Sequence, residues 1–268
     1  FHAAAVFRPC DDPLRDMVRP NIASTEAVLL ACAGSTSVPA LVLTSSMAAV
    51  RAPGQPFRPG RSCYDHHDWN SLSVAEDGWG AAYQFSKAQS ERMAWERAGE
   101  LGVPLIALCP CAIIGPERRL PGTAPGRFPW MSAAAIHSDG PEGGMLLADV
   151  RDVASAHAAA GELLASGGAA AGERVVVSAE EGVSVSCLAE AWGRLEAGGD
   201  EGAAGVARLP RGAREVECAD RLESLLGVGC RALEETLRDM ASDHRAAWRA
   251  PAAAAGGGVL GGLLELFR

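Results

Sequence analysis

The chain has 268 residues, of which 48% are hydrophobic and 21% charged, and these proportions are typical of a globular protein with one large domain or two small ones. Its formal net charge of −9 argues against nucleic-acid and membrane partners, because nucleic acids and anionic membranes both attract basic surfaces. Eight cysteines without a Cys-x-x-Cys spacing predict reduced thiols in the cytoplasm rather than a disulfide framework.

In the N-terminal half, apolar residues recur at helical or strand spacing between segments rich in Pro, Gly and polar residues. The opening residues 1–7 are typical of the end of a buried strand, which predicts that the chain is a fragment. The pattern that follows predicts a helix at 13–33, a strand at 38–43, a surface loop at 51–80, a helix at 79–101 that Gly102 caps, and a strand at 103–108.

The C-terminal half continues this alternation of strands and helices. The pattern predicts a loop at 116–144 with a short helix at 132–136, strands at 145–150 and 174–178, helices at 152–164, 184–195, 215–226 and 233–248, and a poorly ordered tail at 250–262. The uncharged stretch at 250–264 is too short and too weakly apolar to span a membrane. Strands separated by amphipathic helices predict an α/β fold with a parallel sheet.

The distribution of basic residues singles out one helix. The chain contains 24 basic residues but only one lysine, Lys87, which lies four residues after Tyr83, one of only two tyrosines. Arg replaces Lys on a solvated surface but not where a compact ammonium is required. Side chains at i and i+4 share a helix face, where an ammonium is expected to lower the pKa of a phenol and so make it a proton donor or acceptor.

Polar residues follow the predicted strand that precedes this helix. Thr44, Ser45 and Ser46 come directly after the apolar run, and ligands of parallel α/β sheets gather outside the carboxyl ends of the strands. A serine hydroxyl there can hold a substrate oxygen beside Tyr83. By contrast, the Asp65–Asp68 segment with its two histidines is interpreted as a solvated loop, because no third distant metal ligand is evident, and no metal site is predicted.

Taken together, these segments resemble the extended short-chain dehydrogenase/reductases, close to the branch of dihydroflavonol, cinnamoyl-CoA and aldehyde reductases. The resembling segments occur in the order FHAAAVF (1–7), PNIASTEAVLLAC (20–32), LVLTSSMAAV (41–50), YDHHDWN (64–70), WGAAYQFSKAQSERMAWERA (79–98), LCPCAIIGP (108–116), ADVRDVASAH (148–157) and LLGVGCRALEETLRD (225–239). The resemblance implies a Rossmann-type parallel sheet that lacks its first strands, with a smaller C-terminal substrate-binding lobe. Residues 1–115 would form the partial dinucleotide-binding domain, residues 116–248 the lobe, with a returning strand near 174–178, and residues 249–268 a low-complexity tail.

The resemblance also implies a catalytic tetrad. Tyr83 would give the proton, Lys87 would bind the ribose hydroxyls of the nicotinamide nucleotide and tune Tyr83, and Ser46 would bind the substrate carbonyl, with Ser45 as the alternative. Asn21 would hold a water of the proton relay through its helix backbone. The residues implied in cofactor binding are Ala3, Thr44, Ser45, Tyr83, Lys87, Pro110, Ala112 and Ile113.

The function implied by the resemblance is reduction of an aldehyde or ketone, on a flavonoid-like or phenylpropanoid-like skeleton as one option, by a monomer or homodimer with NADP as cofactor and NAD as the alternative. Two other functions stay open. One is an epimerase or dehydratase acting on nucleotide sugars, with the same Tyr/Lys pair. The other is a catalytically impaired remnant, because the family's glycine-rich phosphate loop is not among these residues. We therefore expect this chain alone to be poorly soluble and to bind cofactor weakly.

Overall fold

The computed structural model describes residues 1–37, 40–116, 144–167, 172–179, 182–196 and 219–248. At its centre is a parallel sheet in which β1 (Leu41–Thr44), β2 (Leu105–Pro110) and β6 (Glu173–Val177) lie in the order β1-β2-β6. The α/β class and the parallel sheet predicted from the sequence are confirmed. Among the described residues, no helix combines the length and the apolar character needed to cross a membrane.

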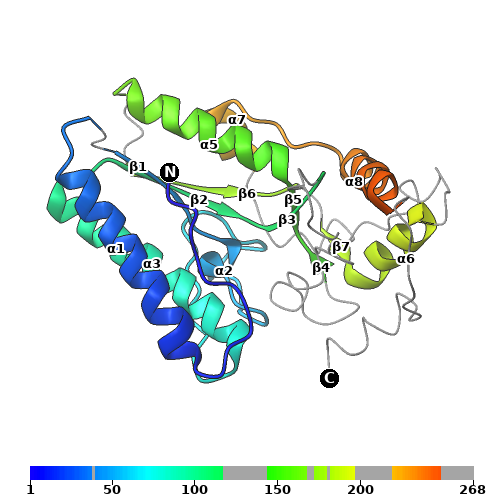
Figure 1. Ribbon diagram of the computed structural model, residues 1–268, viewed down its shortest axis with the longest axis horizontal. Coiled ribbons are helices and arrows are strands. Elements are labelled where there is room, and N and C mark those ends of the chain that lie inside the picture. The colour runs from blue at the N-terminus through cyan, green and yellow to red at the C-terminus, as the bar shows by residue number, and fades with distance from the viewer. Residues whose placement is uncertain (38–39, 117–143, 168–171, 180–181, 197–218, 249–268) are drawn as a thin grey trace.

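Helices cover both faces of this sheet, as Figure 1 shows. On one face lie α1 (Arg19–Ala33), which follows a π-helical turn, η1 (Leu14–Val18), and α3 (Trp79–Leu101). On the other lie α5 (Val150–Ala165) and α7 (Ala219–Leu226). Leu41 and Leu43 pack toward α1 and α3, whereas Val42 packs toward α5. Because both faces are buried, β1 and β2 are nearly continuous apolar runs without alternation, whereas β6 also carries the buried Arg174.

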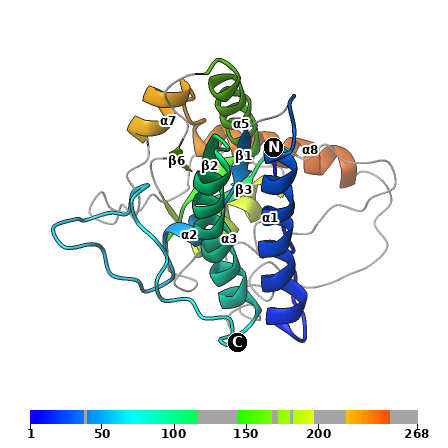
Figure 2. The same ribbon diagram turned by 90° about the vertical axis from the view of Figure 1, so that its left-hand side faces the viewer.

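The N-terminal residues run alongside β1. His2 donates its backbone N–H to Val42 O at 2.9 Å and accepts from Thr44 N at 2.9 Å, in parallel orientation. Further along, Val6 exchanges hydrogen bonds with the side chain of Asn21, at 2.6 and 3.2 Å. The segment predicted to be the end of a strand therefore adds a single bridge to the sheet and is then held by α1, whose side-by-side packing with α3 is seen in Figure 2.

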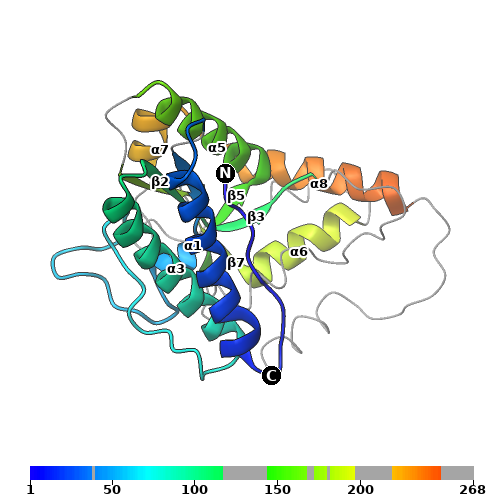
Figure 3. The same ribbon diagram turned by 60° about the vertical axis from the view of Figure 1, so that its left-hand side comes forward.

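A second group of elements extends from the carboxyl end of the sheet. Here β3 (Ala112–Ile114) pairs in parallel with β5 (Leu147–Asp149), and β4 (Gly144–Met145) pairs antiparallel with β7 (Val183–Ser184). Helices α6 (Val185–Glu196) and α8 (Leu233–Trp248) pack on these strands around the fully buried Trp192, on the side away from α1 and α3 (Figure 3).

Most helix bounds agree with the sequence pattern, and α3 agrees at both ends, where Gly102 forms its left-handed cap with φ 65°. The strands differ more. The strand predicted to stop near Cys109 continues through Pro110, which lies beyond the last β1 partner, so its missing N–H removes no bond to β1. Three features were not predicted: the short helix α2 (Met47–Val50), the strand β3, and the division of 145–150 into two strands. The predicted helix at 132–136 and the tail lie outside the described residues.

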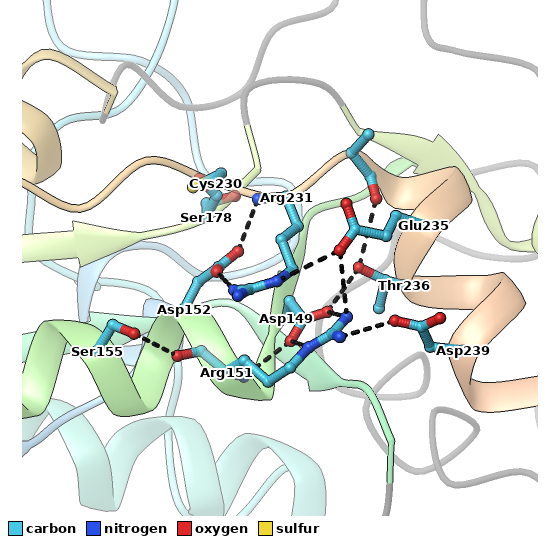
Figure 4. A network of polar contacts seen from close by, with 11 residues as sticks. Asp149, Arg151, Asp152, Ser155, Ser178, Cys230, Arg231, Glu235, Thr236 and Asp239 are labelled. Atoms are coloured by element: carbon cyan, nitrogen blue, oxygen red, sulfur yellow. Dashed lines mark hydrogen bonds and ion pairs between the residues drawn. The ribbon is translucent and has the colours of Figure 1, made fainter. Parts of the chain in front are cut away.

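A network of polar contacts joins α5 to α8 and is drawn in Figure 4. Asp149 caps the N-terminus of α5 by accepting from Arg151 N at 2.8 Å, and it also accepts from the Arg151 guanidinium and, at 2.7 Å, from Thr236 Oγ1 on α8. Arg151 in turn donates to Asp239 at 2.7 Å. One buried carboxylate thus connects the end of β5 to both helices.

Replacing Asp149 with alanine is expected to lower the free energy of unfolding by about 2–4 kcal/mol, since a helix cap and charge-assisted bonds are lost together. Burial raises the pKa of Asp149, but hydrogen bonds from Arg151 and Thr236 outweigh it and hold the pKa below its usual value. The stabilisation is therefore fully present above the unfolded pKa and is lost as pH falls through the lower folded pKa. Urea unfolding at neutral and acidic pH measures this stabilisation.

Asp239→Ala, which breaks a more exposed pair with the same Arg151, should cost only about 0–1 kcal/mol. An equal loss in both variants would contradict the assignment.

Candidate active site

One face of α3 meets the end of β1 through two residues one helical turn apart. Tyr83 and Lys87 are both on this face, as the i, i+4 spacing predicts. The Ser46 side chain lies beside the Tyr83 hydroxyl and acts on its pKa as a hydrogen-bond partner. The Lys87 ammonium donates to Thr44 O at 2.8 Å. The structure therefore places the proposed acid and its ammonium at the carboxyl end of the strand, as expected.

The two serines at the end of β1 point to different partners. Ser46 contacts Tyr83 and also accepts from Ala48 N at 3.1 Å, which caps α2. Ser45 donates its hydroxyl to Glu91 Oε2 at 2.5 Å. Of the two serines that could bind the substrate carbonyl, Ser46 is thus the one that lies beside the phenol.

The electrostatics of Tyr83 differ from the sequence-based expectation. Burial raises the pKa of Tyr83, and the opposing contribution comes from its hydrogen bond with Ser46 rather than from Lys87. The expected lowering of the Tyr83 pKa by the ammonium is therefore wrong. The physical reason is that the side chain is packed against Phe7, with ring centroids 4.6 Å apart, and loses more hydration than the serine replaces.

Lys87 is strongly affected by burial as well. Its side chain is only 8% exposed, and burial lowers its pKa from 10.5 to about 8, while the nearby Glu91 carboxylate acts in the opposite direction. An arginine could not replace Lys87, because its planar guanidinium is larger than the compact ammonium of lysine.

Asn21 lies on α1 facing α3. Its side chain is buried and donates to Ser86 Oγ at 3.0 Å in addition to its contacts with Val6. A small cavity is lined by Asn21, Lys87 and Ser90, among others. The hydroxyl of Ser90 is buried and has no hydrogen-bond partner within the described part of the chain. A polar cavity with an unpaired hydroxyl is suited to one water molecule.

The remaining predicted cofactor residues are spread along the same edge. Ile113 is 42% exposed although its neighbours Ala112 and Ile114 are buried, so an apolar side chain faces outward just after β2. Pro110 is buried at the end of β2, and Ala3 is exposed beside β1. Because Ala112 packs in the core with β5 and α6, only its backbone could face a ligand.

Three polar residues at this site were not predicted. Glu91 and Arg174 form a buried ion pair, with Arg174 Nε 2.6 Å from Glu91 Oε1. His157 accepts from Thr44 Oγ1 through Nε2 at 2.7 Å, because its Nδ1 must donate to Val153 O. The i, i+4 spacing of Glu91 from Lys87 was a visible signal, whereas Arg174 and His157 are distant in sequence.

The histidine loop does bring three possible metal ligands together. Ligand atoms of Asp65, His66 and His67 lie within 4.8 Å of one another. However, the Asp65 carboxylate already accepts from Arg58 at 2.7 Å and from Arg61 at 3.0 Å. Two guanidinium groups on its oxygens disfavour binding of a cation there. The close approach of these side chains is accounted for by the ion pairs of Asp65 with the two arginines.

The parallel sheet with helices on both faces, and the polar side chains at its carboxyl edge, define a Rossmann-like α/β protein. A model of the male sterility protein family of NAD-binding domains, NAD_binding_4, matches residues 1–139. The chain belongs to this family within the extended short-chain dehydrogenase/reductases, in the branch of dihydroflavonol and cinnamoyl-CoA reductases.

The relatives in sequence are reductases by name, whereas the solved structures of similar fold include both reductases and epimerases. The chain is 32% identical over 120 residues to tetraketide alpha-pyrone reductase 1 of Arabidopsis thaliana, covering 44% of this chain and 35% of that protein. It is 31% identical over 124 residues to dihydroflavonol 4-reductase of Hordeum vulgare, covering 43% and 32%. The chain thus spans about a third of the length of these relatives. The yeast methylglyoxal/isovaleraldehyde reductase complexed with NADPH superposes with a TM-score of 0.63 at 23% identity, over 90% of this chain and 74% of that one.

Proposed function

We propose that the protein reduces a carbonyl group of a small molecule by hydride transfer from NAD(P)H, with Tyr83 as the proton donor. The observation that carries the proposal is the meeting of Tyr83 with Ser46 at the carboxyl end of β1, where the Lys87 ammonium, one helical turn away, donates to Thr44 O at 2.8 Å. The family of NAD-binding domains and the reductase names of the relatives support the class of reaction.

Each residue of the site has a separate role in the proposed reaction. A reduced nicotinamide, when bound, supplies the hydride to the carbonyl carbon. Ser46 donates a hydrogen bond to the carbonyl oxygen and polarises it, and Tyr83 transfers its hydroxyl proton to that oxygen as negative charge develops. Because burial raises the pKa of Tyr83, the hydroxyl is protonated at neutral pH and ready to donate. Ser46 then stabilises the phenolate that is left, because as a hydrogen-bond partner it favours the charged form of Tyr83.

Several features of the site fit a nicotinamide nucleotide. An ammonium has three donors, and one of those of Lys87 is directed to Thr44 O, so two remain, one for a ribose hydroxyl and one for a water molecule. The exposed Ile113 after β2 offers an apolar surface for a flat ring. NADP is the preferred nucleotide, since the yeast reductase with a similar fold is complexed with NADPH, and NAD is the alternative. Residues 1–115 would form the nucleotide-binding part and residues 116–248 the substrate lobe.

The cavity next to Asn21 supports a proton relay that returns a proton to Tyr83. Its lining includes the Lys87 ammonium and the unpaired Ser90 hydroxyl, both of which can bind a water. The Asn21 backbone oxygen, however, already accepts from Thr25 Oγ1 at 3.0 Å and Ser24 Oγ at 3.1 Å. In the proposed relay, the water is therefore bound by Lys87 and Ser90, and Asn21 holds the position of the helix.

A substrate panel tests the proposal. The purified protein is mixed with NADPH and, separately, with aromatic aldehydes, dihydroflavonols, cinnamoyl thioesters and nucleotide sugars, and the loss of absorbance of NADPH is followed. We expect oxidation of NADPH with a carbonyl compound. Conversion of a nucleotide sugar without net NADPH loss would instead identify an epimerase or dehydratase. Failure to bind NADPH in a titration would identify a catalytically impaired chain.

The two serines provide a sharper prediction for the same reaction. Ser46→Ala is expected to lower kcat by about 10²-fold, because a donor to the developing oxyanion is lost. Ser45→Ala, the matched control one residue earlier, should lose less, since its hydroxyl is directed to Glu91 and not to Tyr83. Steady-state kinetics with the active carbonyl substrate measure both. A larger loss in Ser45→Ala would reverse the assignment.

A further inference from the structure

Glu91 is a fully buried carboxylate one helical turn beyond Lys87. Its Oε2 accepts from Ser45 Oγ at 2.5 Å and lies 3.6 Å from the Cys109 thiol, while its Oε1 accepts from Trp95 Nε1 at 3.2 Å. Arg174 on β6 binds both oxygens, at 2.6 and 3.2 Å. The carboxylate therefore contacts the end of β1 directly and is held there from the far side of the sheet's central strand.

Arg174 is itself fixed by several elements. It donates to Ala49 O of α2 at 3.2 Å, to His66 O at 3.0 Å and to Asp68 O, and its guanidinium lies 3.9 Å from the centroid of the Trp69 ring. The side chain cannot move without breaking contacts to α2 and to the loop around Trp69. It forms a rigid support for the Glu91 carboxylate.

A buried ion pair of this kind is weak evidence for stability, because apolar residues of similar volume often serve a core as well. This pair differs from an ordinary buried ion pair in its position next to the contacts between the end of β1 and α3. Three consecutive residues at the end of β1 bond to three successive turns of α3: Thr44 to Lys87, Ser45 to Glu91 and Ser46 to Tyr83.

We propose that Glu91, held by Arg174, is a positioning residue that anchors the end of β1 through Ser45, so that Ser46 faces Tyr83, and whose carboxylate is the counter-charge of the Lys87 ammonium one helical turn away in the lining of the same small cavity. Its catalytic consequence rests on the proposed carbonyl reduction, but its effect on Lys87 does not. A residue with this role completes a row of three on one face of α3, at positions 83, 87 and 91.

The charges around Lys87 define what Glu91 contributes. The groups that face the ammonium are Thr44 O from β1, His2 from the N-terminal segment, Cys109 from β2 and Glu91 from its own helix. Burial raises the pKa of the Cys109 thiol to about 12, so it is neutral near pH 7. Burial also lowers the pKa of His2, which leaves that ring neutral as well. Within the described residues, Glu91 is thus the anionic group that offsets the cost of burying the ammonium.

The single lysine allows a direct test. Protein labelled with ¹³C-lysine gives one Cε resonance, whose shift against pH reports the pKa of Lys87 without any enzyme assay. The wild-type protein should titrate near pH 8. Glu91→Gln should titrate at lower pH, and Glu91→Asp, which keeps the charge but withdraws it, should fall between the two. Glu96→Gln, the same change on the exposed side of α3, should titrate like the wild type.

The pH dependence of turnover supplies the second readout. In Glu91→Gln the ammonium loses its proton at lower pH, so the alkaline fall of kcat also moves to lower pH. The loss of kcat relative to the wild type therefore grows with pH. It approaches about tenfold for each unit by which the pKa of Lys87 falls. Glu91→Asp should recover part of it. If Glu91→Gln does not fold, Glu91→Asp carries the titration alone. An unchanged Lys87 titration in a folded variant would overturn the proposal, whereas a shifted titration without carbonyl reduction by the wild-type protein would sink only the proposed function.

Discussion

Phenylalanine in place of Tyr83 is expected to lower kcat for NADPH-dependent carbonyl reduction by about 10²–10⁴-fold, the usual contribution of a general acid. The affinity for NADPH should stay within a few-fold, because the substitution removes only a hydroxyl that bonds to Ser46 and leaves Lys87 in place. Stopped-flow turnover and a fluorescence titration with NADPH separate these two quantities.

The chain supplies its own control for this experiment. Its other tyrosine, Tyr64, lies in the loop before the histidines and donates its hydroxyl to Gln55 O. Tyr64→Phe removes the same atom from a hydroxyl that bonds to Gln55 O and not to the end of β1, and it should leave kcat unchanged. Equal turnover of Tyr83→Phe and wild type would exclude Tyr83 as the proton donor, whatever the substrate.

The largest expected effect on stability comes from Arg174. Replacing it with methionine is expected to lower the free energy of unfolding by about 3–5 kcal/mol, because Glu91 would remain buried without its counter-ion. Chemical denaturation followed by circular dichroism measures the change. The loss of the bonds to Ala49 O and Asp68 O acts in the same direction.

Arg92 offers a matched control for this substitution. Its guanidinium lies 4.4 Å from the centroid of the same Trp69 ring, but the residue is exposed. Arg92→Met should cost about 0.5–1 kcal/mol, the value of an exposed cation–π contact. Combining Arg174→Met with Glu91→Leu should recover most of the lost stability, since no unpaired charge remains. Failure to recover it would mean that the bonds of Arg174 to the backbone, and not the ion pair, carry the effect.

The comparison of α3 with β2 shows where sequence patterns are reliable. The end of α3 was predictable because it depends on a local feature, the glycine in the left-handed cap at Gly102. The end of β2 depends on where its neighbours end. Pro110 can extend the strand because β1 has already stopped at Thr44, which no local pattern reports.

The same distinction holds at the site. The unique lysine, the tyrosine one turn before it and the serines after an apolar run predicted the helix face and the sheet edge that meet in the structure. The choice between Ser45 and Ser46 depended on which hydroxyl faces Tyr83, and hence on the packing of α3 against β1. The direction of the pKa shift of Tyr83 was predicted wrongly, because proximity to Lys87 was visible in the sequence and burial was not.

The sequence by itself determined the α/β class, the order of the main helices and the pairing of Tyr83 with Lys87 on one face of α3, because these follow from periodicity and from residue types that cannot replace one another. Only the tertiary structure decided that Arg174, 83 residues beyond Glu91, is its partner, and that burial sets the proton affinities of Tyr83 and Lys87. The reason is physical. Desolvation and ion pairing depend on which segments lie against one another, and distances along the chain do not report distances through the folded core.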